Sequence, residues 1–250
     1  MKSACLSALL LLSAALPAQA PVPLAHGDVP GEPHHHLKVE NTFVRAYYVE
    51  VAPHADTQLH QHDHDYIFVT LGATDVINAV LGKPEARLVL KDGEVHFSRG
   101  GFAHIARNLS DAPFRNVTIE FLHGQGEGRN VCAEVLQGSP VTGVCAAPVP
   151  NASMVFSISL FDTDETSARL YSLSPTVAAP PLTSNMDHLL VVYDQSYIES
   201  HLEGESPRAL RGGDLLWLPA GSNAVIRNTG VKLARYLLIS FKDSASAKKP

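Results

Sequence analysis

One short segment of the chain concentrates side chains that bind metal ions. It runs from His60 to Tyr66 and has the sequence HQHDHDY, which contains three imidazoles, two carboxylates and a phenol. On a β-strand, residues two apart point to the same face and lie about 7 Å from each other. His60, His62, His64 and Tyr66 would therefore share one face. Because a strand in a small barrel twists, two such imidazoles can converge on one ion.

Two ligands alone make a weak site, so a third must come from elsewhere, and His104 is the candidate. It follows Gly100-Gly101 closely, and paired glycines permit a tight turn that can direct a nearby side chain inward. We therefore expect His60, His62 and His104 to hold a divalent metal ion.

The elements that must position these residues are predicted to be strands. Short segments rich in β-branched and aromatic residues alternate with clusters of Gly, Pro, Asp and Asn, and no long helical periodicity occurs. The clearest of these segments are residues 43–51, 66–69, 86–90 and 117–122. The chain is therefore predicted to be all-β.

The same pattern of special residues occurs twice. Matching residues recur at an offset of 122 in the first part of the unit and of 120 in the second. The pairs are Pro53/Pro175, Asp65/Asp187, Gly93/Gly213, Gly101/Gly221, Asn108/Asn228, Arg115/Arg235 and Phe121/Phe241. We infer two copies of one β unit, at residues 37–123 and 152–242.

The second copy keeps the turn residues and lacks the candidate ligands. Leu182, Ser184 and Ala224 stand where the first copy has its three histidines, whereas the glycines and the asparagine are retained. Residues that both copies keep serve the fold, and histidines that are absent together serve another purpose. We therefore expect a metal site in the first copy only.

These residues resemble the two sequence motifs of the cupin superfamily. The first motif, G-x5-H-x-H-x3,4-E-x6-G, is matched by His60, His62 and Gly72, with His54 at the position of the leading glycine. The second, G-x5-P-x-G-x2-H-x3-N, is matched by Gly93, Gly101, His104 and Asn108, with Arg99 in place of proline. The resemblance covers nearly all of the mature chain. It implies two tandem cupin (jelly-roll) β-barrels, with the metal inside the N-terminal one.

The sequence departs from the first motif at its acidic ligand. The motif places a glutamate four or five residues after the second histidine, where this chain has Tyr66 and Ile67. The nearest acid is Asp65, which strand alternation turns away from the ion unless a bulge brings it in. We assign the fourth position first to water or Tyr66, then to His64, and then to Asp65. Asp187, in the copy without ligands, favours a structural role for Asp65.

The N-terminus has the features of a secretory signal peptide. Lys2 supplies a positive charge, an apolar run follows, and the segment ends in the small-x-small pattern that signal peptidase recognises. We expect a signal peptide at residues 1–20, cleavage after Ala20, and a periplasmic or secreted protein. The mature chain is expected to contain no membrane segment.

Three further segments are expected to lie outside the barrels. A lead rich in Pro and His, residues 21–36, is predicted to be irregular, and its run His34-His35-His36 is interpreted as a solvated loop. The linker of residues 124–151 contains Cys132 and Cys145. An even number of cysteines in an exported chain predicts a disulfide, which would stabilise the fold by roughly 3 kcal/mol in the chain-entropy model. A polar tail follows at residues 243–250.

The predicted site suits an ion that binds small oxygen-containing ligands. Three neutral imidazoles leave a divalent ion its full charge and open positions for a carboxylate, an enolate, dioxygen or water. Imidazole ligands suit Fe, Ni, Cu and Zn, and an added carboxylate also suits Mn. The first hypothesis is a metal-dependent dioxygenase, decarboxylase or isomerase for a small organic acid, with Tyr66 or His64 donating or accepting a proton.

The alternative is a non-catalytic cupin in which the metal stabilises the barrel or anchors a small ligand. An additional inward-facing acid near the pocket would favour catalysis, and Glu120 is the best candidate. The net charge of -6 and the lack of a basic stripe exclude a typical nucleic-acid partner. Cupin barrels also pair through strand edges, so a homodimer is an alternative to pairing within one chain.

Overall fold

The computed structural model of the protein describes residues 26–130 and 155–242. The expected signal peptide, the two linker cysteines and the polar tail lie outside these residues. The described part consists of strands and one short 3-10 helix, which confirms the all-β prediction. Within it, no helix is long and apolar enough to cross a membrane.

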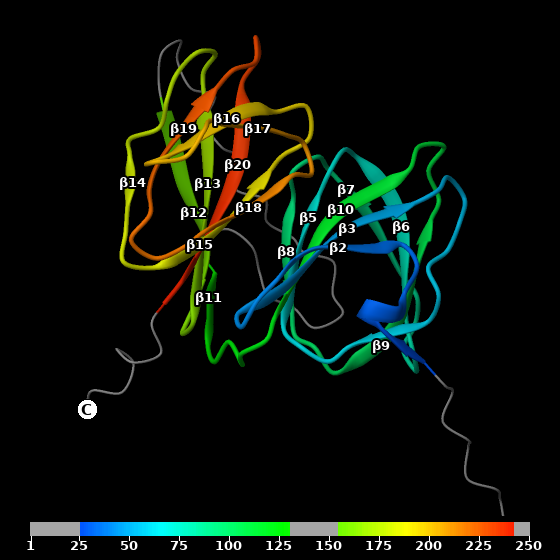
Figure 1. The fold of residues 1–250 in the computed structure, drawn as a ribbon. Helices are drawn as coiled ribbons and strands as arrows, with labels where there is room; N and C mark the ends of the chain where they lie inside the picture. The colour runs from blue at the N-terminus through cyan, green and yellow to red at the C-terminus, as the bar shows by residue number, and fades with distance from the viewer. Residues whose placement is uncertain (1–25, 131–154, 243–250) are drawn as a thin grey trace, which may run out of the picture.

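Strands β1–β10 form the N-terminal barrel, shown in blue to green in Figure 1. They are β1 Gly27–Asp28, β2 His35–Glu40, β3 Val44–Val51, β4 His60–His62, β5 Tyr66–Thr70, β6 Thr74–Val80, β7 Ala86–Leu90, β8 Val95–Ser98, β9 Phe102–Asn108 and β10 Phe114–Phe121, with the 3-10 helix η1 at Val29–Gly31. Two five-stranded sheets enclose the interior, in the orders β1-β4-β9-β6-β7 and β2-β3-β10-β5-β8.

Strands β11–β20 form the C-terminal barrel beside it. They are β11 Gly128–Asn130, β12 Val155–Thr163, β13 Thr166–Leu173, β14 Leu182–Thr183, β15 Asp187–Val192, β16 Tyr197–Leu202, β17 Arg208–Arg211, β18 Leu215–Leu218, β19 Asn223–Asn228 and β20 Ala234–Phe241. The sheet orders β12-β13-β20-β15-β18, extended by β11, and β14-β19-β16-β17 repeat those of the first barrel, except that β1 has no counterpart among the described strands. The sequence repeat is therefore a structural repeat.

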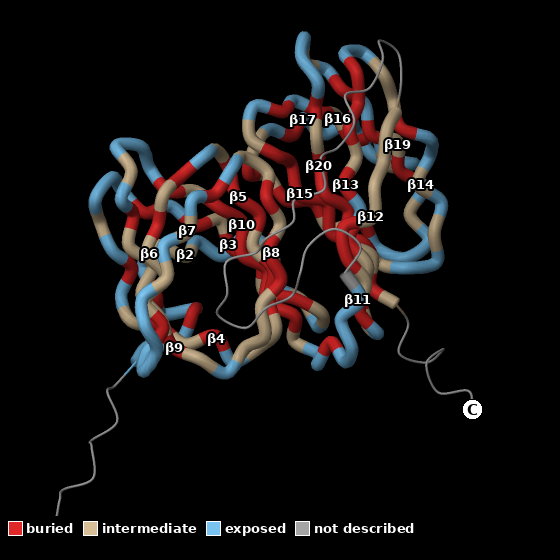
Figure 2. Tube along the Cα trace, turned by 180° about the vertical axis from the view of Figure 1, so that it is seen from behind, coloured by how far each residue is buried: buried red, intermediate tan, exposed pale blue. Residues whose placement is uncertain are grey.

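Strands β5 and β10 of the first barrel are buried on both faces, because the second barrel covers the face that points away from the interior. Along β10, Val117, Ile119 and Phe121 point outward into a cluster that also contains Phe161 and Phe241 of the second barrel. Figure 2 shows buried residues concentrated along β5, β10, β15 and β20, where the barrels face each other. The two barrels thus share one hydrophobic core where they meet, in addition to a separate core cluster inside each barrel.

The only tryptophan of the chain belongs to this shared core. The Trp217 ring stacks on Phe43 at a centroid distance of 5.8 Å and lies 5.1 Å from the Phe241 ring. Aromatic pairs at such distances contribute about 0.5–1.5 kcal/mol beyond the area that they bury. The contact stabilises the pairing of barrels within the chain.

Two repeated glycines lie where the barrels meet. Gly93 and Gly213 both adopt positive φ angles, of 75° and 87°. A Cβ atom at Gly93 would lie 2.6 Å from Tyr193 Cε2, and one at Gly213 would lie 3.0 Å from Tyr48 Cε2. Each glycine is therefore required both by its backbone angle and by an aromatic ring of the opposite barrel.

The repeated asparagines hold equivalent turns. Asn108 Nδ2 donates to the Ala112 carbonyl at 2.8 Å, and Asn228 Nδ2 donates to the Lys232 carbonyl at 2.8 Å. Both side chains are fully buried. Because both barrels have this turn and only one has the histidines, the asparagine serves the fold, as expected from the sequence.

Two segments differ from the expectation. Residues 27–36 are not irregular, because β1 pairs in parallel with β4 and β2 pairs with β3. The predicted linker also contains a strand: β11 adds to the second barrel by pairing with β12. The sequence signals for both strands are weak, since β1 and β11 have only two and three residues.

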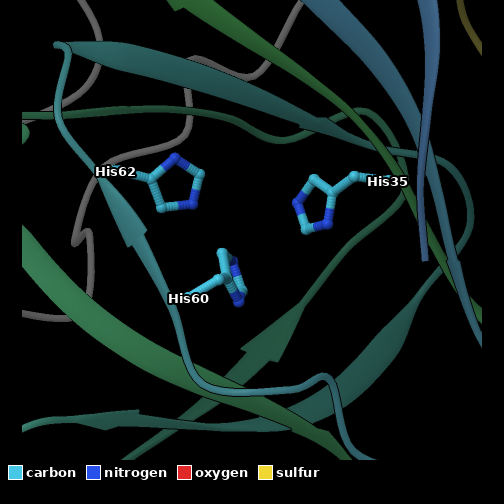
Figure 3. A group of neighbouring side chains, drawn as sticks. All are labelled: His35, His60 and His62. Carbon is cyan, nitrogen blue, oxygen red and sulfur yellow. The ribbon is translucent and has the colours of Figure 1, made fainter. Parts of the chain in front are cut away.

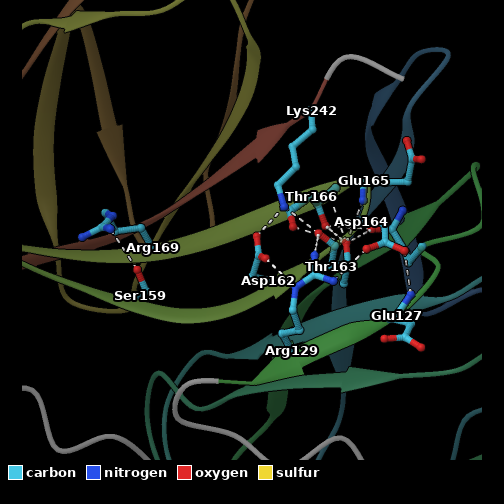
Figure 4. Close-up of polar contacts among 11 residues, drawn as sticks. Glu127, Arg129, Ser159, Asp162, Thr163, Asp164, Glu165, Thr166, Arg169 and Lys242 are labelled. Atoms are coloured by element: carbon cyan, nitrogen blue, oxygen red, sulfur yellow. Dashed lines mark hydrogen bonds and ion pairs between the residues drawn. The ribbon is translucent and has the colours of Figure 1, made fainter. Parts of the chain in front are cut away.

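A polar network fastens β11 to the β12–β13 turn (Figure 4). Arg129 donates to Asp162 Oδ2 at 3.0 Å and to Asp164 Oδ1 at 2.7 Å. Lys242, which follows β20, contacts Asp162 Oδ1 at 2.5 Å and the Thr163 carbonyl at 2.6 Å. The network thereby holds β11, the segment that follows the first barrel, on the second barrel.

The contact between Gly93 and Tyr193 predicts a difference between two Gly→Ala variants. Gly82 has the same φ as Gly93, 75°, but no atom lies within 4 Å of its Cβ position. Gly82→Ala should cost about 1–2 kcal/mol for the left-handed backbone alone. Gly93→Ala should cost a further 1–3 kcal/mol or so, because its methyl group collides with the Tyr193 ring. Urea unfolding of both variants measures the difference, and equal costs would contradict the proposed packing.

Candidate metal centre

Two of the three predicted ligands lie directly opposite each other on neighbouring strands. β4 pairs antiparallel with β9, and the register places His60 opposite His104. Their rings lie with centroids 4.6 Å apart, and the two Nε2 atoms are 3.1 Å apart. The strand pairing itself therefore brings together imidazoles that are far apart in the sequence.

The other ring nitrogen of each imidazole is already used. His60 Nδ1 lies 2.8 Å from the Gln58 carbonyl, and His104 Nδ1 lies 2.7 Å from Asn78 Oδ1. Because both oxygens can only accept, both Nδ1 atoms carry the proton, and both Nε2 atoms present lone pairs. Two lone pairs at 3.1 Å repel each other unless a cation lies between them. The pair therefore fits a metal ion with bonds to nitrogen of about 2.1 Å.

His62 joins this pair from the same strand. Its ring centroid lies 5.2 Å from that of His60 and 5.2 Å from that of His104. His62 Nδ1 lies 3.2 Å from Glu120 Oε1 on β10, in the opposite sheet. Glu120, the inward acid expected from the sequence, thus contacts a predicted ligand and holds its Nδ1. The structure brings His60, His62 and His104 together.

The structure adds a fourth imidazole that the sequence interpretation missed. One nitrogen each of His35, His60 and His62 lies within 4.8 Å of the others, and the three rings face a common space (Figure 3). His35 Nδ1 lies 2.6 Å from Glu32 Oε2, which places the lone pair of the neutral ring on Nε2. The interpretation of His34-His35-His36 as a solvated loop is therefore wrong for His35, whose side chain is buried in the site.

Burial keeps these imidazoles in the neutral form that binds metals. Loss of hydration lowers the pKa of His60 to about 4 and lowers the pKa values of His62 and His104 well below the ordinary value. Loss of hydration also disfavours a charged carboxylate, and it raises the pKa of Glu120 to about 7. At neutral pH the histidines are therefore ready as ligands without first releasing a proton.

The candidates for the fourth position occupy a bend instead of the expected continuous strand. β4 ends at His62 and β5 begins at Tyr66 in the other sheet, so alternation does not continue through residues 63–65. The Tyr66 ring stacks on His62 at a centroid distance of 4.1 Å, and its hydroxyl interacts with Ser98. Tyr66 therefore packs against a candidate ligand and lies at the cavity wall.

The other two candidates are Asp65 and His64. Asp65 Oδ2 lies 2.7 Å from Arg99 Nη1, and Arg99 in turn donates to the Gly126 carbonyl at 2.6 Å. Asp65 is thus structural, and Arg99, which replaces the motif proline, is its partner. His64 lies in the bend near Glu120. It is not one of the three histidines, His35, His60 and His62, whose ring nitrogens lie close together.

A cavity of about 70 Å³ begins at the imidazoles and extends into the barrel. Thr57, Asn78, Asn116 and Thr118 are polar lining residues. Apolar residues line most of the remainder: Val49, Phe68, Val76, Ile77, Leu88, Leu90, Ala106 and Phe114. Among the described residues that line it, none is Lys, Arg, Asp or Glu. The space admits a small molecule with an apolar body, whose anionic group would find its partner only at the imidazole end.

The sequence matches no protein-family model, and it matches no curated protein. Solved structures do match. AerE from Microcystis aeruginosa has a TM-score of 0.59 at 12% identity over 85% of this chain and 99% of that one. A cupin 2 conserved barrel domain protein from Leptotrichia buccalis has a TM-score of 0.54 at 11% identity, over 82% of this chain and 87% of that one.

A third similar structure is an enzyme. Salicylate 1,2-dioxygenase from Pseudaminobacter salicylatoxidans has a TM-score of 0.59 at 12% identity, over 85% of this chain and 78% of that one. A mutant of the same enzyme was solved in complex with gentisate and is similar at a TM-score of 0.58, at 10% identity over 87% of this chain and 76% of that one. With the paired barrels and their strand orders, these likenesses confirm the expected fold and identify the chain as a two-barrel protein of the cupin fold.

Proposed function

We propose that the N-terminal barrel is a metal centre that acts on a small organic acid, as a metal-dependent dioxygenase, decarboxylase or isomerase. His60, His62 and His104 would hold a divalent ion of Fe, Mn, Ni, Cu or Zn. One observation carries the proposal: His60 and His104 have their Nδ1 protons fixed on oxygen acceptors while their Nε2 lone pairs face each other at 3.1 Å. A pair of surface or core histidines would have no reason for that arrangement.

The residues around the ligands have the arrangement typical of metal centres. An imidazole that binds a metal through one ring nitrogen usually donates the N–H of its other nitrogen to a carboxylate or carbonyl oxygen. This hydrogen bond fixes the ring and makes the metal-binding nitrogen more basic. Gln58, Asn78 and Glu120 supply a carbonyl, an amide oxygen and a carboxylate. A bound divalent ion would polarise a carboxylate or enolate oxygen, or present water or dioxygen.

The cavity supports a small ligand with one anionic end. With no cationic side chain among its described lining residues, an organic acid would place its carboxylate toward the imidazoles and its carbon skeleton among Phe68, Leu88 and Phe114. Gentisate, found in one of the similar structures, has this character. Export to the periplasm or medium is part of the proposal and rests on the signal-peptide pattern.

The alternative is a cupin whose metal has no catalytic role. Glu120 favours catalysis, because it is buried next to His62 and its pKa of about 7 would let it exchange a proton near neutral pH. Oxygen uptake and product analysis with the metal-loaded protein and a panel of organic acids separate the two functions. Metal without turnover would favour the alternative.

Replacement of His62 tests the metal site. His62→Ser should lower the metal content from about one ion per chain to a small fraction, because one of few ligands is lost. The fold should persist, since the second barrel has Ser184 at the matching position. Metal analysis and circular dichroism of the purified protein measure both effects. His201→Ala, which removes a histidine of the second barrel, is the control and should keep the metal.

Two results would contradict this proposal. Metal content that is unchanged in His62→Ser would refute the site. Loss of cooperative unfolding together with the metal would instead make the ion structural.

Replacement of Ala106 tests where the ligand binds. Ala106 lines the cavity, and a phenyl ring at this position should fill it without removing an imidazole. Ala106→Phe should therefore retain the metal and weaken gentisate binding by at least about tenfold, as measured by calorimetry on metal-loaded protein. Ala209→Phe, at an exposed position of β17, should bind gentisate as the unaltered protein does. Equal binding by both variants would place the ligand outside the cavity.

A further inference from the structure

We propose that His35 is a fourth ligand of the metal and that Glu32 is the positioning residue that orients it, so that residues 27–36 form part of the metal centre. This inference rests on the proposed function and adds to it a ligand from outside both cupin motifs. It assigns a purpose to a segment that the sequence interpretation placed outside the barrel.

The segment is anchored to the strand that carries the ligands. Gly27 lies opposite His60 in the parallel pairing of β1 with β4, and its amide donates to the Leu59 carbonyl at 3.1 Å. Val29 is 1% exposed and belongs to the core cluster inside the first barrel. Residues 27–29 therefore hold the rest of the segment in a fixed position relative to His60.

Glu32 has no exposed side-chain surface and accepts four hydrogen bonds. Its Oε1 lies 2.7 Å from His34 Nδ1 and 3.1 Å from the Gln58 amide. Its Oε2 lies 2.8 Å from the His34 amide and 2.6 Å from His35 Nδ1. Burial of a carboxylate is unfavourable by several kcal/mol unless such bonds compensate. Burial alone would raise the pKa of Glu32, but these hydrogen bonds and the nearby imidazoles lower it and keep the carboxylate ionised.

The carboxylate fixes the direction of the His35 ring. Because Nδ1 faces Glu32, the lone pair of the neutral ring is on Nε2, where it is available to an ion. The His35 ring centroid lies 4.9 Å from that of His60 and 6.2 Å from that of His62. His35 also lines the cavity, so its ring faces the space that the other imidazoles share.

Glu32 also reaches a second proposed ligand through one residue, Gln58. The Gln58 amide donates to Glu32 at 3.1 Å, and the Gln58 carbonyl accepts from His60 Nδ1 at 2.8 Å. One buried carboxylate therefore orients His35 directly and His60 through the residue between them. Loss of its charge should loosen two ligands at once.

The second barrel gives an independent argument. His35 pairs with Val49 in the first barrel, and Ser157 pairs with Tyr171 in the second. Val49 and Tyr171 are separated by the repeat offset of 122, so Ser157 takes the place of His35. The second barrel thus lacks His35 together with the three motif histidines. A histidine that served only the packing of β2 would have no reason to be absent with them.

A fourth imidazole changes what the ion can do. Four protein ligands complete a tetrahedral ion such as structural zinc, whereas an ion with six positions would keep two open. The identity of the bound metal therefore decides between a closed and an open centre.

The test is a Co(II) titration of four proteins: the unaltered chain, His35→Ala, Glu32→Gln and the control His36→Ala. His36 is the exposed neighbour of His35 on the same strand. Glu32→Gln should weaken Co(II) binding about 10- to 100-fold, the usual loss for a residue that orients a ligand. His35→Ala should weaken it at least as much and shift the visible Co(II) spectrum, and His36→Ala should change neither.

Adding free imidazole to the His35→Ala variant distinguishes a role of His35 as a metal ligand from a role in packing alone. If His35 binds the ion, free imidazole in the vacated space should restore the spectrum of the unaltered protein, which it would not do for a structural defect. Thermal unfolding of each metal-free variant checks the fold, and if Glu32→Gln is unfolded, the His35→Ala titration with imidazole decides.

The possible failures are distinguishable. If the unaltered chain does not bind Co(II), the proposed function fails. If it binds, and His35→Ala has the affinity and spectrum of His36→Ala, the function stands and this inference is overturned.

Discussion

The site depends on one constraint: buried imidazoles that present lone pairs to one another. In a barrel interior such an arrangement is unfavourable, because lone pairs repel each other more strongly at low dielectric than in water. It persists because each Nδ1 proton is fixed by an oxygen on a different element, as with Gln58, Asn78 and Glu120. The barrel thus sets the orientation of the rings by placing acceptors from two sheets around them.

The second barrel lacks both the imidazoles and the side chains that would orient them. Ser200 and Ser240 stand at the repeat positions of Asn78 and Glu120, so the partners of the imidazoles are replaced along with the imidazoles. The Ser200 hydroxyl is buried and has no hydrogen-bond partner in the part of the chain that the structure describes, and Ala224 stands where His104 would be. This barrel instead supplies the apolar face that covers the outer side of β3, β5 and β10. It supports the site without taking part in it.

The fold and three of the imidazoles could be predicted because their signals are local. Glycines with positive φ and the buried asparagines recur at fixed offsets, and the histidines belong to short motifs. His35 was missed because its contacts with His60 and His62 join distant segments, and a histidine run is typical of solvated loops. The place of Tyr66 relative to His60 and His62 could not be predicted for another reason: the chain changes sheets at residues 63–65, so strand alternation does not continue across the bend.

This chain lacks the acidic ligand of the first cupin motif, but it has two carboxylates that contact the imidazoles from behind. Glu120 and Glu32 both accept from imidazoles instead of pointing at the proposed ion. Carboxylates in this position make the nitrogens stronger donors while every proposed ligand atom remains uncharged. An ion held in this way keeps its charge for an incoming anion, and the cavity offers that anion no other cation among its described lining residues. The placement of the two acids therefore favours a ligand that binds the centre through its own carboxylate or enolate oxygen.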